Sequence, residues 1–181
     1  MTKTNVINTK NIDLRGQRIL FDANIWILIN GFGADSAKHR ANIYSATYKT
    51  LLAADNRIVT NDYVIGEVFN RCAKLEYEIK KQSDSTIPPL KTYRHTADFA
   101  PALESVRDTC LNILDDCDFI SVSGTHYKID DLVSQCCEQC ADFSDLVLVG
   151  FCRQENLYVM TDDADYSKSG LNVISANKKI V

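Results

Sequence analysis

A set of acidic side chains could do chemistry, because each member stands after a predicted strand or near the start of a predicted helix. Its members are Asp22, Glu67, Asp142, Asp145, Asp162 and Asp163. Carboxylates gathered at one point repel one another, and hard divalent cations relieve that repulsion. Mg²⁺ and Mn²⁺ both suit such oxygen ligands. A site of this kind fits phosphodiester hydrolysis, in which one metal activates water and another stabilises the leaving oxygen.

Short apolar strands that alternate with helices are expected to bring these acids together. The predicted strands cover residues 18–22, 57–60, 118–123, 157–161 and 171–174. Amphipathic or apolar helical patterns lie between them, which predicts an α/β fold with a mainly parallel sheet of about five short strands and helices on both faces. Ligands bind such sheets beyond the carboxyl ends of the strands, and we expect the acids to converge there.

Each acid also has a structural explanation. Asp22 could cap the helix that follows its strand, and Asp142 could cap the apolar helix after it. Glu67 could pair with Arg71 four residues later on the same helix. Asp145 is harder to explain in this way, because a carboxylate on an otherwise apolar helix is costly without a partner. The acids after residue 161 could form a solvated turn.

Length and charge set limits on the function. The chain has 181 residues, which is the length of one domain. Its formal net charge of −4 argues against a nucleic-acid binder driven by overall charge, but not against an acidic metal site. The longest mostly apolar run, 145–152, is too short to cross a membrane, and residues 1–11 lack a secretory signal. We therefore expect no membrane association and a cytoplasmic location.

Seven cysteines, an odd number, favour a reducing compartment over a disulfide framework. Cys137 and Cys140 form a CxxC pair next to Cys136, but no second pair stands at zinc-finger spacing. We interpret these residues as small side chains of an apolar helix. Neither His nor Cys stands among the acidic set, which argues against a zinc protease or deaminase.

Four segments resemble the PIN-domain family of metal-dependent ribonucleases, and most of all the toxin nucleases of bacterial toxin–antitoxin pairs. The segments are 19–27 (ILFDANIWI), 59–69 (VTNDYVIGEVF), 144–152 (SDLVLVGFC) and 158–166 (YVMTDDADY). The resemblance implies a three-layer α/β/α PIN-like fold over residues 18–181. Residues 1–17 are then a polar N-terminal extension, and about 80–130 is a helical and loop elaboration of the domain.

The same resemblance assigns roles to individual residues. The acids that match the catalytic and metal-binding positions of the family are Asp22, Glu67, Asp145 and Asp163. Asp162 competes with its neighbour for the last position, and Asp142 is an extra candidate metal ligand. Asn24 and Thr161 match polar positions that orient ligands or substrate. The implied cofactor is one or two Mg²⁺ or Mn²⁺ ions.

The resemblance implies an endoribonuclease that hydrolyses RNA phosphodiester bonds and leaves a 5′-phosphate. A role as the toxin of a toxin–antitoxin pair would add an antitoxin protein as partner, and relatives of that kind suggest a homodimer. Two alternatives stay open. One is a housekeeping RNA-processing nuclease, and the other is a non-catalytic PIN-like module that binds RNA or a protein. The complete acid set argues against the non-catalytic module.

A basic cluster after the helix that carries Glu67 is the candidate RNA-binding surface. Its cations are Lys74, Lys80, Lys81, Lys91, Arg94 and His95, and Tyr77 and Tyr93 stand among them. Basic and aromatic side chains together suit a single-stranded backbone with stacked bases. We assign RNA binding to Lys74, Lys80, Lys81 and Arg94. The alternative is a solvated helix end and loop, which is the commoner explanation of such a cluster.

Overall fold

A single sheet of six parallel strands forms the centre of the protein. The computed structural model describes residues 3–32, 37–139 and 142–180. The strands are β1 (Asn5–Asn8), β2 (Arg18–Phe21), β3 (Arg57–Thr60), β4 (Asp118–Phe119), β5 (Tyr158–Met160) and β6 (Asn172–Ser175). Their order across the sheet is β1-β6-β5-β2-β3-β4, and every described pair is parallel.

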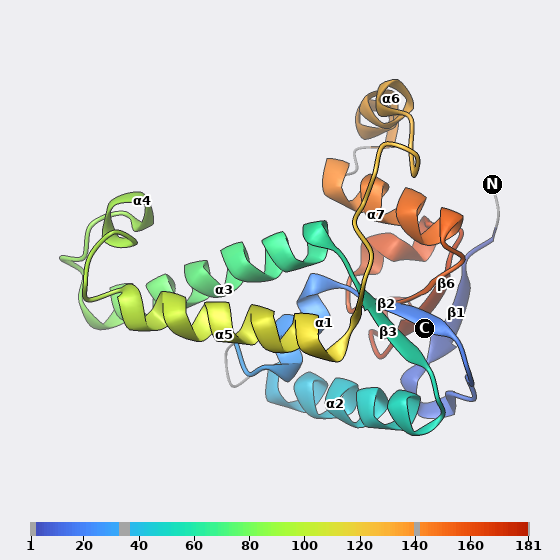
Figure 1. Ribbon diagram of the computed structural model, residues 1–181, viewed down its shortest axis with the longest axis horizontal. Helices are drawn as coiled ribbons and strands as arrows, with labels where there is room; N and C mark the ends of the chain where they lie inside the picture. Colours follow the sequence, from blue (N-terminus) through green and yellow to red (C-terminus); the bar gives the residue numbers. More distant parts are fainter. Residues whose placement is uncertain (1–2, 33–36, 140–141, 181) are drawn as a thin grey trace.

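Helices cover both faces of this sheet. They are α1 (Ala23–Ile29), α2 (Lys38–Ala53), α3 (Asp62–Ser83), α4 (Leu90–Tyr93), α5 (Ala100–Asp116), α6 (Ile129–Gln139) and α7 (Phe143–Gln154), with short 3₁₀ turns η1 (Thr9–Asn11) and η3 (Ala164–Lys168). The chain runs from β2 to β4 in one direction across the sheet, and α6 and α7 then carry it back to β5. Right-handed crossovers place the two groups of helices on opposite faces. Figure 1 shows α2 and α7 on opposite sides of the strands, which confirms the three-layer α/β/α PIN-like fold.

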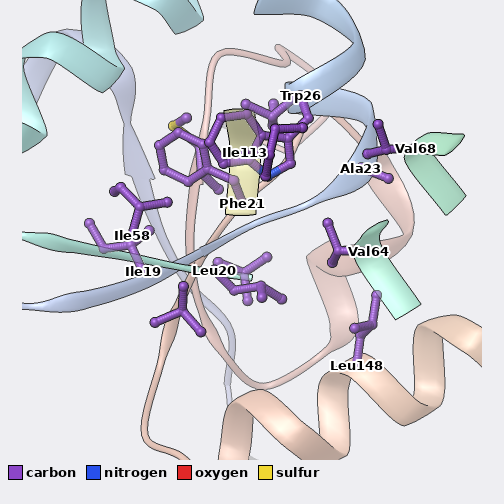
Figure 2. Packing of buried hydrophobic residues seen from close by; sticks show 14 of the residues in the cluster. Ile19, Leu20, Phe21, Ala23, Trp26, Ile58, Val64, Val68, Ile113 and Leu148 are labelled. Atoms are coloured by element: carbon purple, nitrogen blue, oxygen red, sulfur yellow. The ribbon is translucent and has the colours of Figure 1, made fainter. Parts of the chain in front are cut away.

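The central strand explains why the core forms around β2. Ile19, Leu20 and Phe21 are all fully buried, as expected for a parallel strand that is covered on both faces. Helices α1, α3 and α7 contribute further side chains to the same cluster, including Trp26 and Leu148 (Figure 2). The first residue after β2 therefore emerges from the fully buried centre of the core. None of the described helices is both long enough and apolar enough to span a bilayer.

The sheet has one strand more than the sequence predicted, because Asn5–Asn8 pairs with β6. This segment falls within residues 1–17, which were expected to be a polar extension. Its backbone adds a parallel edge strand, and Asn5 Nδ2 donates to Asn172 Oδ1 at 3.1 Å. An edge strand needs little apolar surface, so side-chain polarity did not reveal it. In the opposite sense, β4 has two residues where six were predicted.

A buried amide joins the segment before β2 to the end of α2. Asn56 is 4% exposed, and its Oδ1 accepts a hydrogen bond from the Gln17 backbone N–H at 2.9 Å. Its Nδ2 donates to the carbonyl oxygens of Leu14 at 2.8 Å and Leu51 at 2.9 Å. The side chain therefore satisfies three backbone groups from two separate segments and fixes the entry into the central strand.

Replacing Asn56 with Ala is expected to lower the free energy of unfolding by about 2 kcal/mol, because the Gln17 N–H and the Leu14 carbonyl lose the side-chain partner and Leu51 keeps only its backbone donors. Urea denaturation measures this change. Asn70→Ala is the matched control, since Asn70 lies exposed on α3 and its loss should change stability by less than about 0.5 kcal/mol. Equal destabilisation by the two variants would show that the buried amide does not hold these segments.

Helices α3 and α5 lie side by side and extend away from the sheet as an arm, with α4 at its far end (Figure 1). The arm has a small core of its own, centred on Tyr93, Phe99 and Ala102. The region of about 80–130, which was predicted as an elaboration, contains most of this arm together with β4 and the start of α6. Only the first turns of α3 stay near the carboxyl ends of the strands.

Candidate functional site

The candidate site starts at the junction of β2 and β5. The chain continues from β2 to β3 on one side, whereas β5 lies on the other side of β2. Ligands bind parallel α/β sheets at such switch points, outside the carboxyl ends of the strands. Phe21 is in register with Met160, so the next residues of the two strands, Asp22 and Thr161, stand next to each other at that edge.

Asp22 is held by a network of side-chain hydrogen bonds. Its carboxylate oxygen Oδ2 accepts from Thr161 Oγ1 at 2.7 Å and from Asn24 Nδ2 at 2.5 Å. Asn24 Nδ2 also approaches Thr161 Oγ1 at 3.0 Å, and the Asp163 backbone N–H donates to the same hydroxyl at 3.0 Å. Asp22 is the N-cap residue of α1, but its side chain makes no capping bond. The carboxylate is oriented toward its polar neighbours instead of toward the helix.

Burial raises the pKa of Asp22 to about 7, and only 6% of the residue is exposed. The hydrogen bond from Thr161 lowers that pKa, whereas the negative charges of Glu67 and Asp145 raise it. Two acids from α3 and α7 therefore act on the acid that follows β2. Acids that are up to 123 positions apart in the chain, Asp22 and Asp145, therefore lie close enough to interact electrostatically.

Asp145 is the second strongly perturbed acid. Burial raises its pKa to about 6, and the charges of Asp163, Asp142 and Glu67 add to that rise in this order. Asp142 is exposed and is the N-cap residue of α7, again without a side-chain capping bond. Four acids of the predicted set, from α3, from the start of α7 and from the turn after β5, thus act on Asp145 or on Asp22.

Asp162 and Asp163 face different surroundings, although they are adjacent in the chain. The carboxylate of Asp162 accepts a hydrogen bond from the Tyr44 hydroxyl at 2.7 Å and forms an ion pair with Arg40. Asp163 instead raises the pKa of Asp145, and its Oδ1 accepts from the Asp165 backbone N–H at 3.0 Å at the start of η3. The structure therefore favours Asp163 over Asp162 as the acid on the side of Asp22 and Asp145.

Glu67 takes part both in the ion pair with Arg71 and in the electrostatics of the acidic set, the two roles that the sequence left open. It forms the i,i+4 ion pair with Arg71, with Oε1 at 3.0 Å from Nη1. Its charge also raises the pKa of Asp22 and of Asp145. Surface pairs of this kind contribute only a few tenths of a kcal/mol, so the pair leaves Glu67 available for another role.

The donor set matches the chemistry of Mg²⁺ or Mn²⁺, since all its members are carboxylates. Within residues 3–32, 37–139 and 142–180, however, no three His, Cys, Asp or Glu side chains stand close enough together to hold a metal ion. The negative charges of Glu67 and Asp145 raise the pKa of Asp22, and those of Asp163, Asp142 and Glu67 raise the pKa of Asp145, so a divalent cation would relieve repulsion here. The side chains would have to close around an ion to bind it.

Several buried polar groups near the site were not predicted. The hydroxyl of Tyr166, Thr60 Oγ1 and Asn61 Nδ2 are buried and have no hydrogen-bond partner in the described part of the chain. Burial raises the pKa of Tyr166 well above its usual value, and the charges of Asp22 and Asp145 contribute to that rise. Tyr166 lies within the matched segment 158–166, but the motif gave no role to this position.

The lysines of the predicted RNA-binding cluster have partners within the arm. Lys80 Nζ donates to the carbonyl oxygen of Asp98 at 3.1 Å and lies 3.6 Å from its carboxylate. Lys81 Nζ donates to the carbonyl oxygens of Ser85, at 2.8 Å, and of Ile87. The contacts of Lys81 tie the end of α3 to the loop after it, and those of Lys80 tie it to the segment just before α5. They fit the alternative of a helix end and loop better than an RNA-binding surface.

The aromatic side chains of this cluster are less available than the sequence suggested. Tyr93 is 5% exposed, packs against Phe99 with ring centroids 5.1 Å apart, and hydrogen-bonds through its hydroxyl to Asp98. It therefore cannot present a face to a nucleobase, and that expectation is wrong. Lys74 lies 3.8 Å from Glu78, and Arg94 is exposed just after α4.

Three of the cysteines, Cys72, Cys110 and Cys152, are buried as free thiols. Cys136 is half-buried and Cys137 is exposed, both on α6. The interpretation of the CxxC pair as small buried side chains is therefore wrong for Cys137. Cys140, the second member of the pair, lies outside the described residues.

The metal-free protein is expected to lose stability as the pH rises from about 4 to about 7. The pKa of Asp22 is raised from 3.8 to about 7, so between these values the folded state binds a proton that the unfolded state has lost. The full shift corresponds to about 4 kcal/mol. Urea denaturation in EDTA at a series of pH values measures this slope, and Asp22→Asn should reduce it. An unchanged slope in the variant would assign the pH dependence to other groups.

No protein-family model matches the sequence, and no curated protein matches it. Among solved structures, the fold is similar to a chain of VapBC2 from Rickettsia felis. That structure was crystallised with VapBC2 bound to a DNA fragment from its promoter. The TM-score is 0.52 at 15% identity, over 88% of this chain and 98% of that chain. PAE2754 from Pyrobaculum aerophilum gives a TM-score of 0.47 at 15% identity, over 93% of this chain and 92% of that chain. The likeness to VapBC2 is one of fold, and it confirms the PIN-like fold predicted from the sequence.

Proposed function

We propose that this protein is a metal-dependent endoribonuclease. The buried carboxylate of Asp22 carries the proposal, because it is oriented by Thr161 and Asn24 at the switch point of the sheet. The charges of Glu67 and Asp145 act against its ionisation. Such an arrangement lowers stability in the absence of a compensating cation. Carboxylates that lower the stability of the fold in this way are typical of a functional site and not of a packed core.

In this proposal, one or two Mg²⁺ or Mn²⁺ ions are held by the four acids Asp22, Glu67, Asp145 and Asp163. When bound, the metal supplies an activated water and stabilises the leaving oxygen of the phosphodiester. The chain contributes orientation: Thr161 and Asn24 fix the carboxylate of Asp22 through Oδ2. The Thr161 hydroxyl also fixes the backbone of Asp163, so one side chain positions two of the four acids.

A cleavage assay tests this function. Wild-type protein is incubated with end-labelled single-stranded and hairpin RNA in Mn²⁺, Mg²⁺ or EDTA, and the product ends are identified. We expect cleavage with either metal, none in EDTA, and 5′-phosphate ends. Glu67→Gln, purified in the same way, controls for a contaminating ribonuclease. Cleavage that persists in EDTA, or equal cleavage by Glu67→Gln, would contradict the proposal.

We further propose that the nuclease is the toxin of a toxin–antitoxin pair. The support is the resemblance of its motifs to toxin nucleases, together with the fold likeness to VapBC2. The toxin role implies an antitoxin partner encoded next to this chain. Induction of wild-type protein should arrest growth of the host, and Asp22→Asn should not. Unaffected growth under wild-type induction would favour a housekeeping RNA-processing nuclease.

One observation favours the non-catalytic module as the second candidate. In the described part of the chain, the acidic side chains do not already form a metal cage. A binding module needs no metal, whereas a ligand that binds only the folded state stabilises it. Titration with Mn²⁺ in a thermal-unfolding assay separates the two candidates. A rise in the unfolding temperature with Mn²⁺ supports the enzyme, and no rise together with no cleavage supports the module.

A further inference from the structure

A cleft of about 540 Å³ opens beside the candidate site, between η1, the start of α2 and the segment that follows β6. We call it the basic cleft. It is lined by Asn8, Thr9, Lys10, His39, Arg40, Ile43, Asp162, Ala176, Asn177, Lys178 and Lys179. Its volume falls within the range of about 300–1,000 Å³ that small-molecule sites occupy. Apart from Asp162, none of its lining residues belongs to the acidic set or to the predicted cluster on the arm.

The charge of this cleft is opposite to that of the whole chain. Four permanent cations line it, namely Lys10, Arg40, Lys178 and Lys179, with His39 beside them. Among the described residues that line it, the one acid is Asp162, and its carboxylate is already paired with Arg40. The cleft is therefore strongly positive in a protein whose formal net charge is −4. Clefts lined by one sign of charge concentrate ligands of the opposite sign.

The floor of the cleft is held by a network of hydrogen bonds around Asp162. Tyr44 hydrogen-bonds through its hydroxyl to Asp162 Oδ1 at 2.7 Å and accepts from the Ala176 backbone N–H at 3.0 Å. Asn177 Nδ2 donates to the carbonyl oxygen of Asp162 at 2.6 Å. Asp162 thus binds the floor together, while the side chain of Arg40 stays half-exposed above it. The planar fork of a guanidinium has further donors that suit a phosphate.

The cleft is continuous with the candidate site through one short turn. The backbone N–H of Asp162 donates to Asn24 Oδ1 at 3.1 Å, and Asn24 in turn donates to the carboxylate of Asp22. Thr161 and Asp163, on either side of Asp162, belong to the site. A polymer with regularly spaced negative charges could therefore lie in the cleft and present its next unit to the acids.

We propose that the basic cleft binds the phosphate backbone of single-stranded RNA next to the bond that is cleaved. The proposal rests on the proposed function for the choice of RNA, and on the charge, volume and position of the cleft for the site. It supplies the local positive charge that the acidic chain needs to hold a polyanion. It also places substrate binding close to the carboxylates, and not on the distant arm.

Binding measured in EDTA tests the cleft without any cleavage. The probe is a fluorescent 20-nucleotide oligo(U), and its anisotropy is followed with wild-type protein over a range of salt concentrations. The cleft variant is Lys10→Gln, Lys178→Gln and Lys179→Gln together. The control variant is Lys3→Gln, Lys49→Gln and Lys128→Gln, which removes the same charge from positions that do not line the cleft. Thermal unfolding confirms that both variants are folded.

We expect the cleft variant to bind oligo(U) about tenfold or more weakly, with a salt slope smaller by about 2, because each single-strand phosphate contact contributes about 0.7 to that slope. The control variant should differ much less from wild type. Equal weakening in the two variants, or no binding by wild type at low salt, would overturn the proposal. Tighter binding of a 20-residue polyglutamate through the same lysines would also overturn it and favour an acidic peptide.

Cleavage by the same variants separates this proposal from the proposed function. If wild type cleaves RNA and the cleft variant binds like the control, the cleft proposal fails and the nuclease stands. If the cleft variant loses binding but wild type cleaves no RNA with any metal, the cleft stands and the nuclease fails. If both hold, the cleft variant should cleave with a raised KM and a nearly unchanged kcat.

Discussion

Replacing Asp22 with Asn is expected to reduce metal-dependent RNA cleavage by about 10²–10³-fold or more, because the site loses a ligand of the metal that stabilises the developing charge. The fold should survive, since the asparagine side chain keeps an oxygen that can accept from Thr161 Oγ1. In EDTA at pH 8, the variant should also unfold at a higher temperature than wild type. It no longer carries a buried negative charge whose pKa burial has raised to about 7.

The matched control for this prediction is Asp55→Asn. Asp55 is exposed, and its backbone has a φ of 57°, which Asn adopts readily. It removes the same charge from a turn outside the acidic set, so it should change neither cleavage nor the stabilisation by Mn²⁺. Circular dichroism checks the fold of both proteins. Cleavage by Asp22→Asn within tenfold of wild type would remove Asp22 from the catalytic site.

The strand ends were predictable because their signals are local. Asp22 and Thr161 both follow short apolar strands, and parallel strands bring such positions to one edge of a sheet. The fold class followed from the same alternation of strands and helices. β1 escaped prediction because backbone pairing of a polar edge strand leaves no periodic pattern of apolar side chains.

The choice between Asp162 and Asp163 could not be made from the sequence. Adjacent residues that leave a strand tend to point to opposite sides, and the sequence does not reveal which side faces the acids. The structure places Asp162 with Tyr44 and Arg40, and it places Asp163 near Asp145. Lys80 and Lys81 show the same limit, because their partners are carbonyl oxygens of Asp98, just before α5, and of the loop after α3.

The turn after β5 therefore has two chemically different sides. Thr161 and Asp163 face the acids, where charges repel, and Asp162 faces the basic cleft, where cations surround it. A divalent metal on one side and a phosphate backbone on the other would each relieve an excess of like charge. This arrangement explains why a protein with a formal charge of −4 keeps both features so close together.

Thr161→Val is expected to lower the free energy of unfolding by about 2 kcal/mol. Thr161 is fully buried, and its hydroxyl donates to Asp22 and accepts from Asn24 and from the Asp163 backbone. Valine has nearly the same shape but cannot make these hydrogen bonds, so the Asp163 N–H loses its acceptor, while Asp22 and Asn24 keep their bond to each other. The pKa of Asp22 should rise further, because the Thr161 hydrogen bond lowers it. Cleavage should fall by about 10–100-fold, as for other groups that orient a metal ligand.

Thr60→Val is the matched control, because it makes the same substitution at the end of β3, which lies on the other side of β2 from β5. Thr60 is also fully buried at the end of β3, but its Oγ1 has no hydrogen-bond partner among the described residues. Removing an unsatisfied hydroxyl should leave stability unchanged or raise it. The Mn²⁺ concentration for half-maximal stabilisation should increase in Thr161→Val and stay the same in Thr60→Val. Equal effects of the two substitutions on stability and on this concentration would show that burial of a threonine matters, and not the orientation of Asp22.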